Sequence, residues 1–187
     1  IAFILMNLES ITNPESDNRE VVDLLWFPTG GGKTEAYLGL VAFVIAYRRL
    51  RGMNDDGKHT YESYGTAVLM RYTLRLLTVQ QFQRAATLMC ACEELRLKNK
   101  SQWGDIPFQV GLWVGGAVTP NDRKGAEVKK WDVEASRDKD LAQIKNNNPY
   151  VLINCPWCGK KLRWNDGDII GEPKQWRLFC SRNDCTF

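Results

Sequence analysis

One stretch decides the expected fold of this chain: Trp26-Phe27-Pro28-Thr29-Gly30-Gly31-Gly32-Lys33-Thr34. An apolar run, residues 21–27, leads into the glycines, and a longer, mostly apolar run, residues 35–47, follows them. The first run has the length and content of a buried strand, and the second has those of a helix. Glycines at such a junction let backbone N–H groups turn toward an anion, which the dipole of the following helix also favours. The stretch therefore predicts a phosphate-binding loop.

A phosphate loop assigns chemistry to two side chains. We expect the Lys33 ammonium to reach the β- and γ-phosphates of ATP, and the Thr34 hydroxyl to ligate Mg²⁺. The strict form of the motif has a glycine where this chain has Phe27. The alternative is a plain glycine-rich turn with an exposed lysine, but the apolar runs on both sides favour the phosphate loop.

Farther along the chain, apolar runs alternate with helical patterns. Three runs have the content of buried strands: residues 66–71, 108–114 and 150–154. Residues 74–97 place apolar side chains at helical spacing, and residues 121–146 form a charged helical region whose face we expect to be solvated. Strands that alternate with helices predict βαβ units with right-handed crossovers. We therefore expect an α/β fold, with a parallel sheet flanked by helices and nucleotide at the carboxyl ends of its strands.

Composition narrows the class of protein. The 187 residues suffice for one ordinary domain, or for one domain with a small appendage. The net charge is only +3, so any basic patch for nucleic acid must be local. No charge-free apolar run reaches about 18 residues, and residues 1–8 lack the basic leader of a secretion signal. We expect a cytoplasmic piece of a longer protein, with no membrane span.

Four of the six cysteines have the spacing of a zinc site. Cys155 and Cys158 form a knuckle followed by Gly159, and Cys180 and Cys185 supply a second pair. Four thiolates close a tetrahedral site with no open position, which is typical of structural rather than catalytic zinc. The alternatives are a redox Cys-x-x-Cys pair and unligated thiols. The remaining two lie in a helical stretch, where we expect core thiols: Cys90 and Cys92.

The segment around these cysteines forms the second of two expected domains, residues 155–187, after a first that spans residues 1–154. Residues 161–164 and 176–179 are expected to pair as a hairpin, giving a zinc-ribbon-like module. A module this small buries little apolar surface, so metal would supply most of its folding free energy. Its basic and aromatic side chains suit contact with DNA, whereas the alternative is a structural clip or a partner-docking insert. These side chains are Lys160, Lys161, Arg163, Lys174, Arg177, Arg182, Trp157, Trp164 and Trp176.

The loop and two later motifs resemble those of superfamily-2 helicases. Their first motif, Pro-Thr-Gly-x-Gly-Lys-Thr, is similar to residues 28–34. Residues 73–80 share Arg75 and Gln80 with a motif that holds nucleic-acid backbone, and Gly115-Gly116 is similar to a glycine doublet after the next strand. The resemblance implies a RecA-like P-loop motor domain.

The same resemblance implies functional residues. ATP and Mg²⁺ would be held by the first motif: Pro28, Thr29, Gly30, Gly31, Gly32, Lys33, Thr34 and Glu35. Lys33 and Thr34 would be the catalytic residues among these. Nucleic acid would be held by a second set: Arg75, Gln80, Gly115 and Gly116. The acidic motif and the second motor domain that such motors need are not found in the sequence. We therefore expect this chain alone to hydrolyse ATP negligibly.

With a zinc module placed before any acidic motif, the chain resembles the helicases of the DISARM anti-phage defence systems. The resemblance runs through most of residues 20–187, and the stretches 26–40 and 70–84 carry it together with the cysteines. It implies an ATP-driven translocase on DNA in restriction-like bacterial defence, working with a partner subunit. Two alternatives stay open: a repair or restriction motor outside DISARM, and a nucleotide-binding scaffold whose zinc module docks a protein partner.

Overall fold

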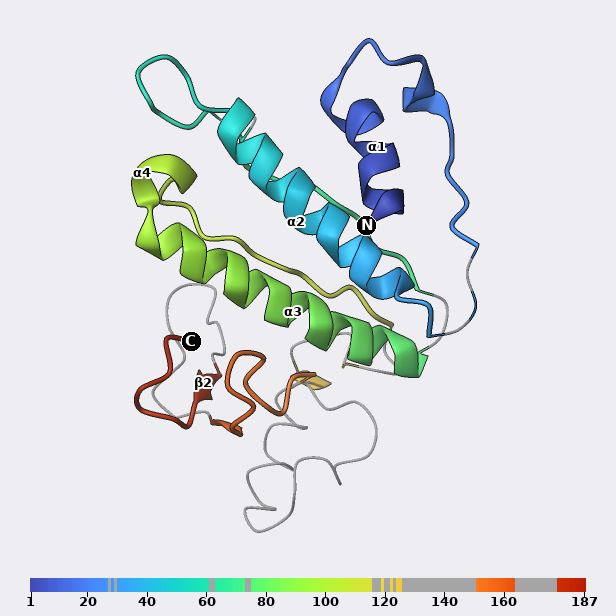
Figure 1. Ribbon diagram of the computed structural model, residues 1–187. Helices are drawn as coiled ribbons and strands as arrows, with labels where there is room; N and C mark the ends of the chain where they lie inside the picture. Colours follow the sequence, from blue (N-terminus) through green and yellow to red (C-terminus); the bar gives the residue numbers. More distant parts are fainter. Residues whose placement is uncertain are drawn as a thin grey trace. The chain divides into compact units, whose positions relative to one another are not determined.

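A computed structural model of the chain describes residues 1–26, 28, 30–60, 63–72, 75–115, 119, 122, 124, 125, 151–163 and 178–187. At residues 75–78 and 163 it describes the backbone alone. The elements appear in Figure 1, and in chain order they are α1 (Ala2–Thr12), the 3-10 helix η1 (Asp17–Glu20), α2 (Lys33–Arg51), α3 (Arg75–Lys98), α4 (Lys100–Trp103), β1 (Leu162–Arg163) and β2 (Phe179–Cys180).

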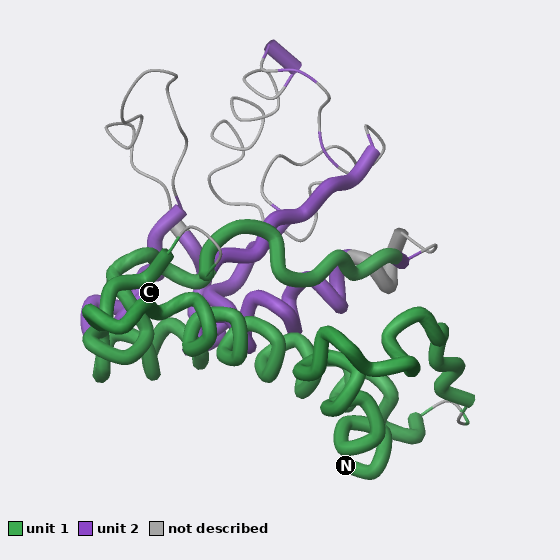
Figure 2. Tube along the Cα trace, turned by 90° about the horizontal axis from the view of Figure 1, so that it is seen from above, with its two compact units in different colours: residues 1–71, 91–108 green, residues 72–90, 109–187 purple. Residues whose placement is uncertain are grey.

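The chain divides into two compact units, which Figure 2 shows in different colours. Unit 1 comprises residues 1–71 and 91–108, and unit 2 comprises residues 72–90 and 109–187. Helix α3 belongs to both, since its residues through Cys90 lie in unit 2 and the rest lie in unit 1. Among the described residues, no helix is both long and apolar enough to cross a membrane.

The expected α/β fold with a RecA-like parallel sheet is wrong. The described residues form helices and one sheet, which consists of the two short antiparallel strands β1 and β2. Within those residues, the strands expected at 21–27, 66–71 and 108–114 have no strand pairing, and the one expected at 150–154 contributes a single bridge. Apolar side chains of these segments are exposed, with Trp26 87% and Trp113 99% accessible to solvent.

The failure of the sheet prediction has a physical reason. Apolar content indicates that a segment favours burial, but a strand also needs a neighbouring strand to accept its N–H and donate to its C=O groups. A helix closes these hydrogen bonds within its own segment. Local signals therefore predicted α2 and α3, whereas strand pairing depends on partners that an apolar run does not specify.

Helix α2 forms as the sequence predicts. Gly32 precedes it with a left-handed φ of 77°, which glycine adopts without a steric penalty. The expected helix, residues 35–47, lies inside the observed one, and basic residues fill the last turn, where they favour the negative end of the helix dipole. Gly52 ends the helix, and its N–H donates to the Arg48 carbonyl over 2.9 Å.

Helix α1 packs along α2 in unit 1 (Figure 1). A Cβ on Gly39 would lie 2.8 Å from Cδ1 of Ile4, so the glycine lets the two helices approach closely. Farther along, the Tyr47 hydroxyl donates to the Thr12 carbonyl over 2.8 Å. That bond satisfies a carbonyl at the end of α1, where no further helical turn can do so.

A group of buried charges, here called the arginine cluster (Arg49, Glu93 and Arg96), lies in unit 1. Arg96 is 3% exposed, and its Nε donates to Glu93 Oε2 over 2.8 Å. Its Nη1 also donates to the carbonyls of Gly104 (2.9 Å) and Asp105 (3.1 Å). Buried charges are tolerated when they are paired and hydrogen-bonded, as these are.

The arginine cluster holds the segment 103–108 from several sides. Arg49 donates to the Trp103 carbonyl over 2.7 Å, and its guanidinium lies 4.5 Å from the ring centroid of Phe108. The Phe108 N–H donates to Glu93 Oε2 over 3.0 Å. The bond from Arg96 holds the pKa of Glu93 below its usual range, and burial lowers the pKa of Arg49. The cluster thus replaces an apolar core for this segment.

Gly52 leaves no room for a side chain, which gives a testable prediction. A Cβ there would lie 2.8 Å from both the Cα and the N of Ser63. Because backbone atoms cannot yield as the tip of a side chain can, we expect Gly52→Ala to lower the free energy of unfolding by about 1–3 kcal/mol, measured by chemical denaturation. Gly111→Ala is the control, since nothing lies within 4 Å of its Cβ position. Equal losses in the two variants would contradict the prediction.

Unit 2 contains most of α3 and the strand pair. The bounds of α3 confirm the helix expected at residues 74–97, and its buried apolar side chains among the described residues are Ala85, Ala86 and Met89. Strands β1 and β2 pair antiparallel, with Leu162 opposite Cys180, and they overlap in part the hairpin expected between residues 161–164 and 176–179. The connection of that hairpin, and nearly all of the helix expected at 121–146, lie outside the described residues.

Candidate metal centre and phosphate-binding loop

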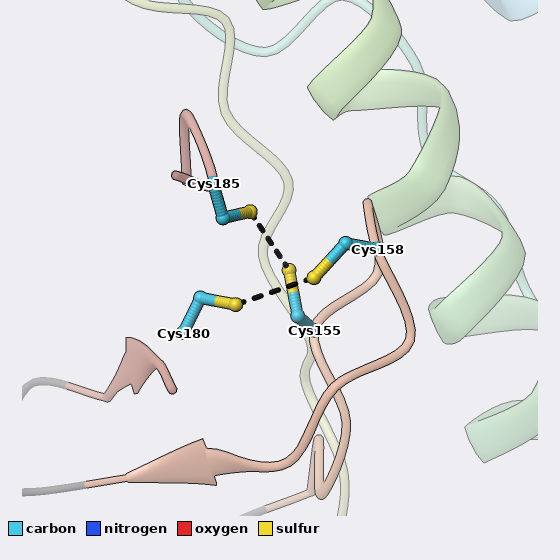
Figure 3. A group of neighbouring side chains, drawn as sticks. All are labelled: Cys155, Cys158, Cys180 and Cys185. Carbon is cyan, nitrogen blue, oxygen red and sulfur yellow. Dashed lines mark hydrogen bonds between the residues drawn. The ribbon is translucent and has the colours of Figure 1, made fainter. Parts of the chain in front are cut away.

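The four cysteines predicted to bind zinc converge in unit 2 (Figure 3), and their Sγ atoms all lie within 4.8 Å of one another. Two contacts cross between the pairs: Cys155 Sγ lies 3.8 Å from Cys185 Sγ, and Cys158 Sγ lies 3.3 Å from Cys180 Sγ. Zinc–thiolate bonds of about 2.3 Å place tetrahedral sulfurs roughly 3.8 Å apart. The cluster has this size, and an all-sulfur ligand set favours zinc or another thiophilic ion over Mg²⁺ or Ca²⁺.

Local backbone structure brings the first pair together. The Cys155 N–H donates to the Lys160 carbonyl over 2.7 Å, and the Gly159 N–H donates to the Cys155 carbonyl over 2.9 Å. Gly159 has a left-handed φ of 76°, which side chains disfavour. The glycine after Cys158 thus relieves the tight bend, as the knuckle pattern predicts. Cys155 is the most buried of the four ligands, at 2% exposure.

Backbone pairing brings the second pair to the first. Asn154 forms a bridge with Lys161, so the knuckle continues directly into β1, and β1 pairs with the strand that ends at Cys180. Cys185 closes a turn in which its N–H donates to the Arg182 carbonyl over 3.2 Å. This turn accommodates the wide spacing between the last two cysteines.

The pKa values of two thiols in the cluster differ from the ordinary value in opposite directions. Hydrogen bonds from the Lys160 backbone and the Cys180 thiol lower the pKa of Cys158 to about 7. Desolvation raises the pKa of Cys180 to about 12. A metal ion must displace thiol protons from the cluster in order to bind.

Two contacts around the cluster carry no signal in the sequence. The Thr87 hydroxyl of α3 lies 3.0 Å from the Pro156 carbonyl, inside the knuckle, and 3.0 Å from the Gln83 carbonyl. Trp157 packs edge-on against Phe187, with ring centroids 5.6 Å apart. One threonine on a helix and one terminal aromatic residue form no pattern from which such contacts follow.

Part of the basic and aromatic surface expected on the module can be placed. Lys160, Lys161 and Trp157 are exposed. Arg182 is exposed too, but its Nη2 donates to Asp184 Oδ2 over 2.7 Å, so its charge is partly balanced. The other side chains of this set lie outside the described part of the structure: Arg163, Trp164, Lys174, Trp176 and Arg177.

The predicted phosphate loop lies in unit 1, directly before α2. Gly30 and Gly32 have left-handed φ values of 86° and 77°. The Gly31 N–H donates to the Pro28 carbonyl over 3.1 Å, and Lys33 Nζ donates to the same carbonyl over 2.9 Å. The lysine thus lies across the glycine turn at the N-terminus of a long helix, where anions are stabilised.

The remaining residues of the loop motif are placed less completely. Thr34 and Glu35 occupy the first turn of α2, with Thr34 half-buried and Glu35 exposed. Thr29 lies outside the described residues. The described part of the loop therefore contains the lysine and the hydroxyl to which the motif assigns phosphate and Mg²⁺.

The residues expected to contact nucleic acid lie in unit 2. Arg75 is the first residue of α3, and Gln80 is exposed on the same helix. Gly115 is exposed, and Gly116 lies outside the described residues. Their role in binding stays a prediction.

No family model matches the chain, and no solved structure is similar to it. Its sequence is 42% identical, over 192 aligned residues that include the whole chain, to the DISARM protein DrmA of Bacillus paralicheniformis. The chain spans 16% of the length of that protein. It is therefore related in sequence to a segment of a DISARM protein.

Proposed function

We propose that this chain is part of an anti-phage defence protein of the DISARM type, and that the parent protein is an ATP-driven helicase or translocase acting on DNA. One observation carries the proposal: the 42% identity to a DISARM protein extends over the entire chain. The alignment therefore includes the segments that carry the glycine loop and the cysteine cluster. A defence role also implies further subunits of the same system as partners.

The geometry of residues 28–35 supports the ATP-binding part of this proposal. Glycines in left-handed conformation lead into a helix N-terminus, with an ammonium group already directed across the turn. Lys33 would supply positive charge to the β- and γ-phosphates, and Thr34 would supply a hydroxyl ligand to Mg²⁺. For DNA we assign contacts to Arg75, Gln80, Gly115 and Gly116.

We further assign a structural zinc ion to the four-cysteine cluster. Four sulfurs of the required separation fill a tetrahedral set, which leaves no position for a reacting molecule. When bound, the ion would supply a cross-link between residues 151–163 and 178–187. The few buried side chains in this region make such a cross-link valuable, since small modules depend on metal for folding.

Lys33→Ala in the full-length parent protein tests the motor proposal. Removing one charge-stabilising donor usually lowers turnover by about 10²–10³-fold, and we expect a loss of this size in DNA-stimulated ATPase activity. Protection against phage, measured as plating efficiency, should fall with it. Lys58→Ala is the matched control, because Lys58 is an exposed lysine in a loop remote from the glycines in sequence. Full protection by Lys33→Ala without ATPase activity would favour a scaffold role instead.

A further inference from the structure

The four sulfurs of the metal centre are not equivalent in their contacts. Cys158 Sγ and Cys180 Sγ lie 3.3 Å apart, closer than the 3.8 Å between Cys155 Sγ and Cys185 Sγ. A disulfide bond is about 2.05 Å long, so the closer pair needs to approach by only about 1.3 Å. The geometry thus distinguishes one pair that is prepared for bond formation.

The four sulfurs also differ in access. Cys155 is buried at 2% exposure, whereas Cys158 and Cys180 are half-buried. An oxidant from solvent therefore reaches both members of the 158–180 pair, but only one member of the 155–185 pair. Oxidation of cysteine follows access as well as thiolate character.

Backbone hydrogen bonds place the segments that carry the two reactive sulfurs side by side. Strands β1 and β2 pair beside Cys180, and the Ser181 N–H donates to the Lys161 carbonyl over 3.2 Å. The knuckle that carries Cys158 has its own hydrogen bonds. A disulfide between Cys158 and Cys180 would join the same two segments that the metal joins, so it can replace the metal without separating them.

We propose that Cys158 and Cys180 form a reversible disulfide when the centre meets a hydroperoxide, and that its formation releases the metal ion. The inference rests on the proposed zinc site and adds a redox-sensitive modification to it. Only two thiolates, Cys155 and Cys185, are left after oxidation. Two ligands are too few for a structural zinc site.

The reaction balances with hydrogen peroxide as oxidant. The Cys158 thiolate attacks one peroxide oxygen, the O–O bond breaks, and a sulfenic acid and a hydroxide form. The Cys180 thiolate then attacks that sulfur and displaces a second hydroxide, giving the disulfide. Two solvent protons convert the hydroxides to water. The two sulfurs lose two electrons, which the peroxide gains, and a dithiol reductant reverses the change by thiol–disulfide exchange.

The test begins with the zinc-loaded chain. Zinc content is measured first, and a chain that takes up no zinc overturns the metal site itself. Peroxide is then added while released zinc is followed with a chromogenic chelator. Free thiols are alkylated, and the protein is digested for mass spectrometry. Trypsin cleaves after Arg182 and so separates the last two cysteines, while chymotrypsin cleaves after Trp157 and separates the first two.

We expect the first cross-linked peptide to join Cys158 to Cys180, in step with zinc release, and dithiothreitol to restore both. A first cross-link within either sequence pair, or zinc release without a cross-link, overturns the redox inference but not the zinc site. Cys92 supplies an internal control, because it lies on α3 outside the cluster and should be recovered alkylated.

Two histidine variants sharpen the test, because imidazole is also a zinc ligand. Cys180→His removes a sulfur of the reactive pair, and Cys185→His leaves that pair intact. We expect Cys180→His to release zinc at least about tenfold more slowly than wild type, since the closely placed Cys180 thiolate can no longer displace the hydroxide. Cys185→His should release it at close to the wild-type rate. Equal rates in both variants overturn the inference, and if a variant binds no zinc, the wild-type cross-link map decides alone.

Discussion

Cys155→Ala will lose zinc binding and unfold the region around the metal centre. This side chain is the most buried of the four ligands, so its loss leaves three thiolates around a cavity that water must fill. Loss of a group that merely hydrogen-bonds a metal ligand weakens binding by roughly 10–100-fold, and loss of a ligand itself should exceed this. Mass spectrometry of metal content should find about one zinc per wild-type chain and almost none in the variant.

Amide hydrogen exchange tests the predicted unfolding of the region around the metal centre. The amides of Cys155, Gly159, Leu162 and Ser181 all donate to backbone carbonyls near the centre. In zinc-loaded wild type they should be protected, and in Cys155→Ala they should exchange about as fast as an unfolded chain. Cys92→Ala serves as the control, since this thiol lies outside the cluster. Unchanged protection in Cys155→Ala would show that the metal does not hold this region together.

Arg96→Ala will have the largest effect on the stability of unit 1. The Arg96 side chain is 4% exposed and the Glu93 side chain 13%. Removing the guanidinium leaves the Glu93 carboxylate with its bond from the Phe108 N–H but without Arg96, and it takes the same donor from two carbonyls. Breaking a buried pair from one side typically costs about 3–5 kcal/mol, and we expect a loss in this range from denaturant unfolding. Lys98→Ala is the matched control, because its bond to Glu94 is exposed and worth at most about 0.5 kcal/mol.

Lowering the pH should reduce the difference in unfolding free energy between wild type and Arg96→Ala. The Arg96 bond lowers the pKa of Glu93 in the folded chain, so the pair contributes its full stability above the carboxyl pKa of the unfolded chain. The contribution is lost as the pH falls through the lowered, folded-state pKa. The stability gap between wild type and Arg96→Ala should therefore narrow at low pH. A gap that is small at neutral pH, or that widens in acid, would contradict the assigned role of the pair.

Sequence reasoning succeeded where the deciding interactions are close together in the chain. Helix α2 begins after Gly32 and ends at Gly52, and both signals lie in the sequence beside the turns that they control. The four cysteines were also identified from the sequence, because a knuckle is a local turn and this spacing of cysteine pairs is typical of a metal site.

The interactions that sequence reasoning missed join distant segments. The parallel sheet was expected from apolar runs alone, and those runs lack strand partners among the described residues. The arginine cluster was also missed, because nothing in the sequence indicates that Arg49, Glu93 and Arg96 come together. The type of a charged residue does not indicate whether its side chain is buried or exposed. Whether such a side chain is buried depends on which backbone carbonyls lie close enough to accept its hydrogen bonds. Here those carbonyls belong to the segment 103–108.

The strand pair beside the metal centre has a consequence for the evolution of chain length. Strands β1 and β2 and the pair Cys158 and Cys180 fix both ends of the intervening residues 164–177. Once the two ends of a chain segment are fixed, doubling the number of residues between them costs only about 0.6 kcal/mol of closure entropy if they are flexible. Insertions and deletions at this point would therefore leave the ligand positions unchanged. Between β1 and β2, related sequences can therefore gain or lose whole segments while keeping the same metal centre.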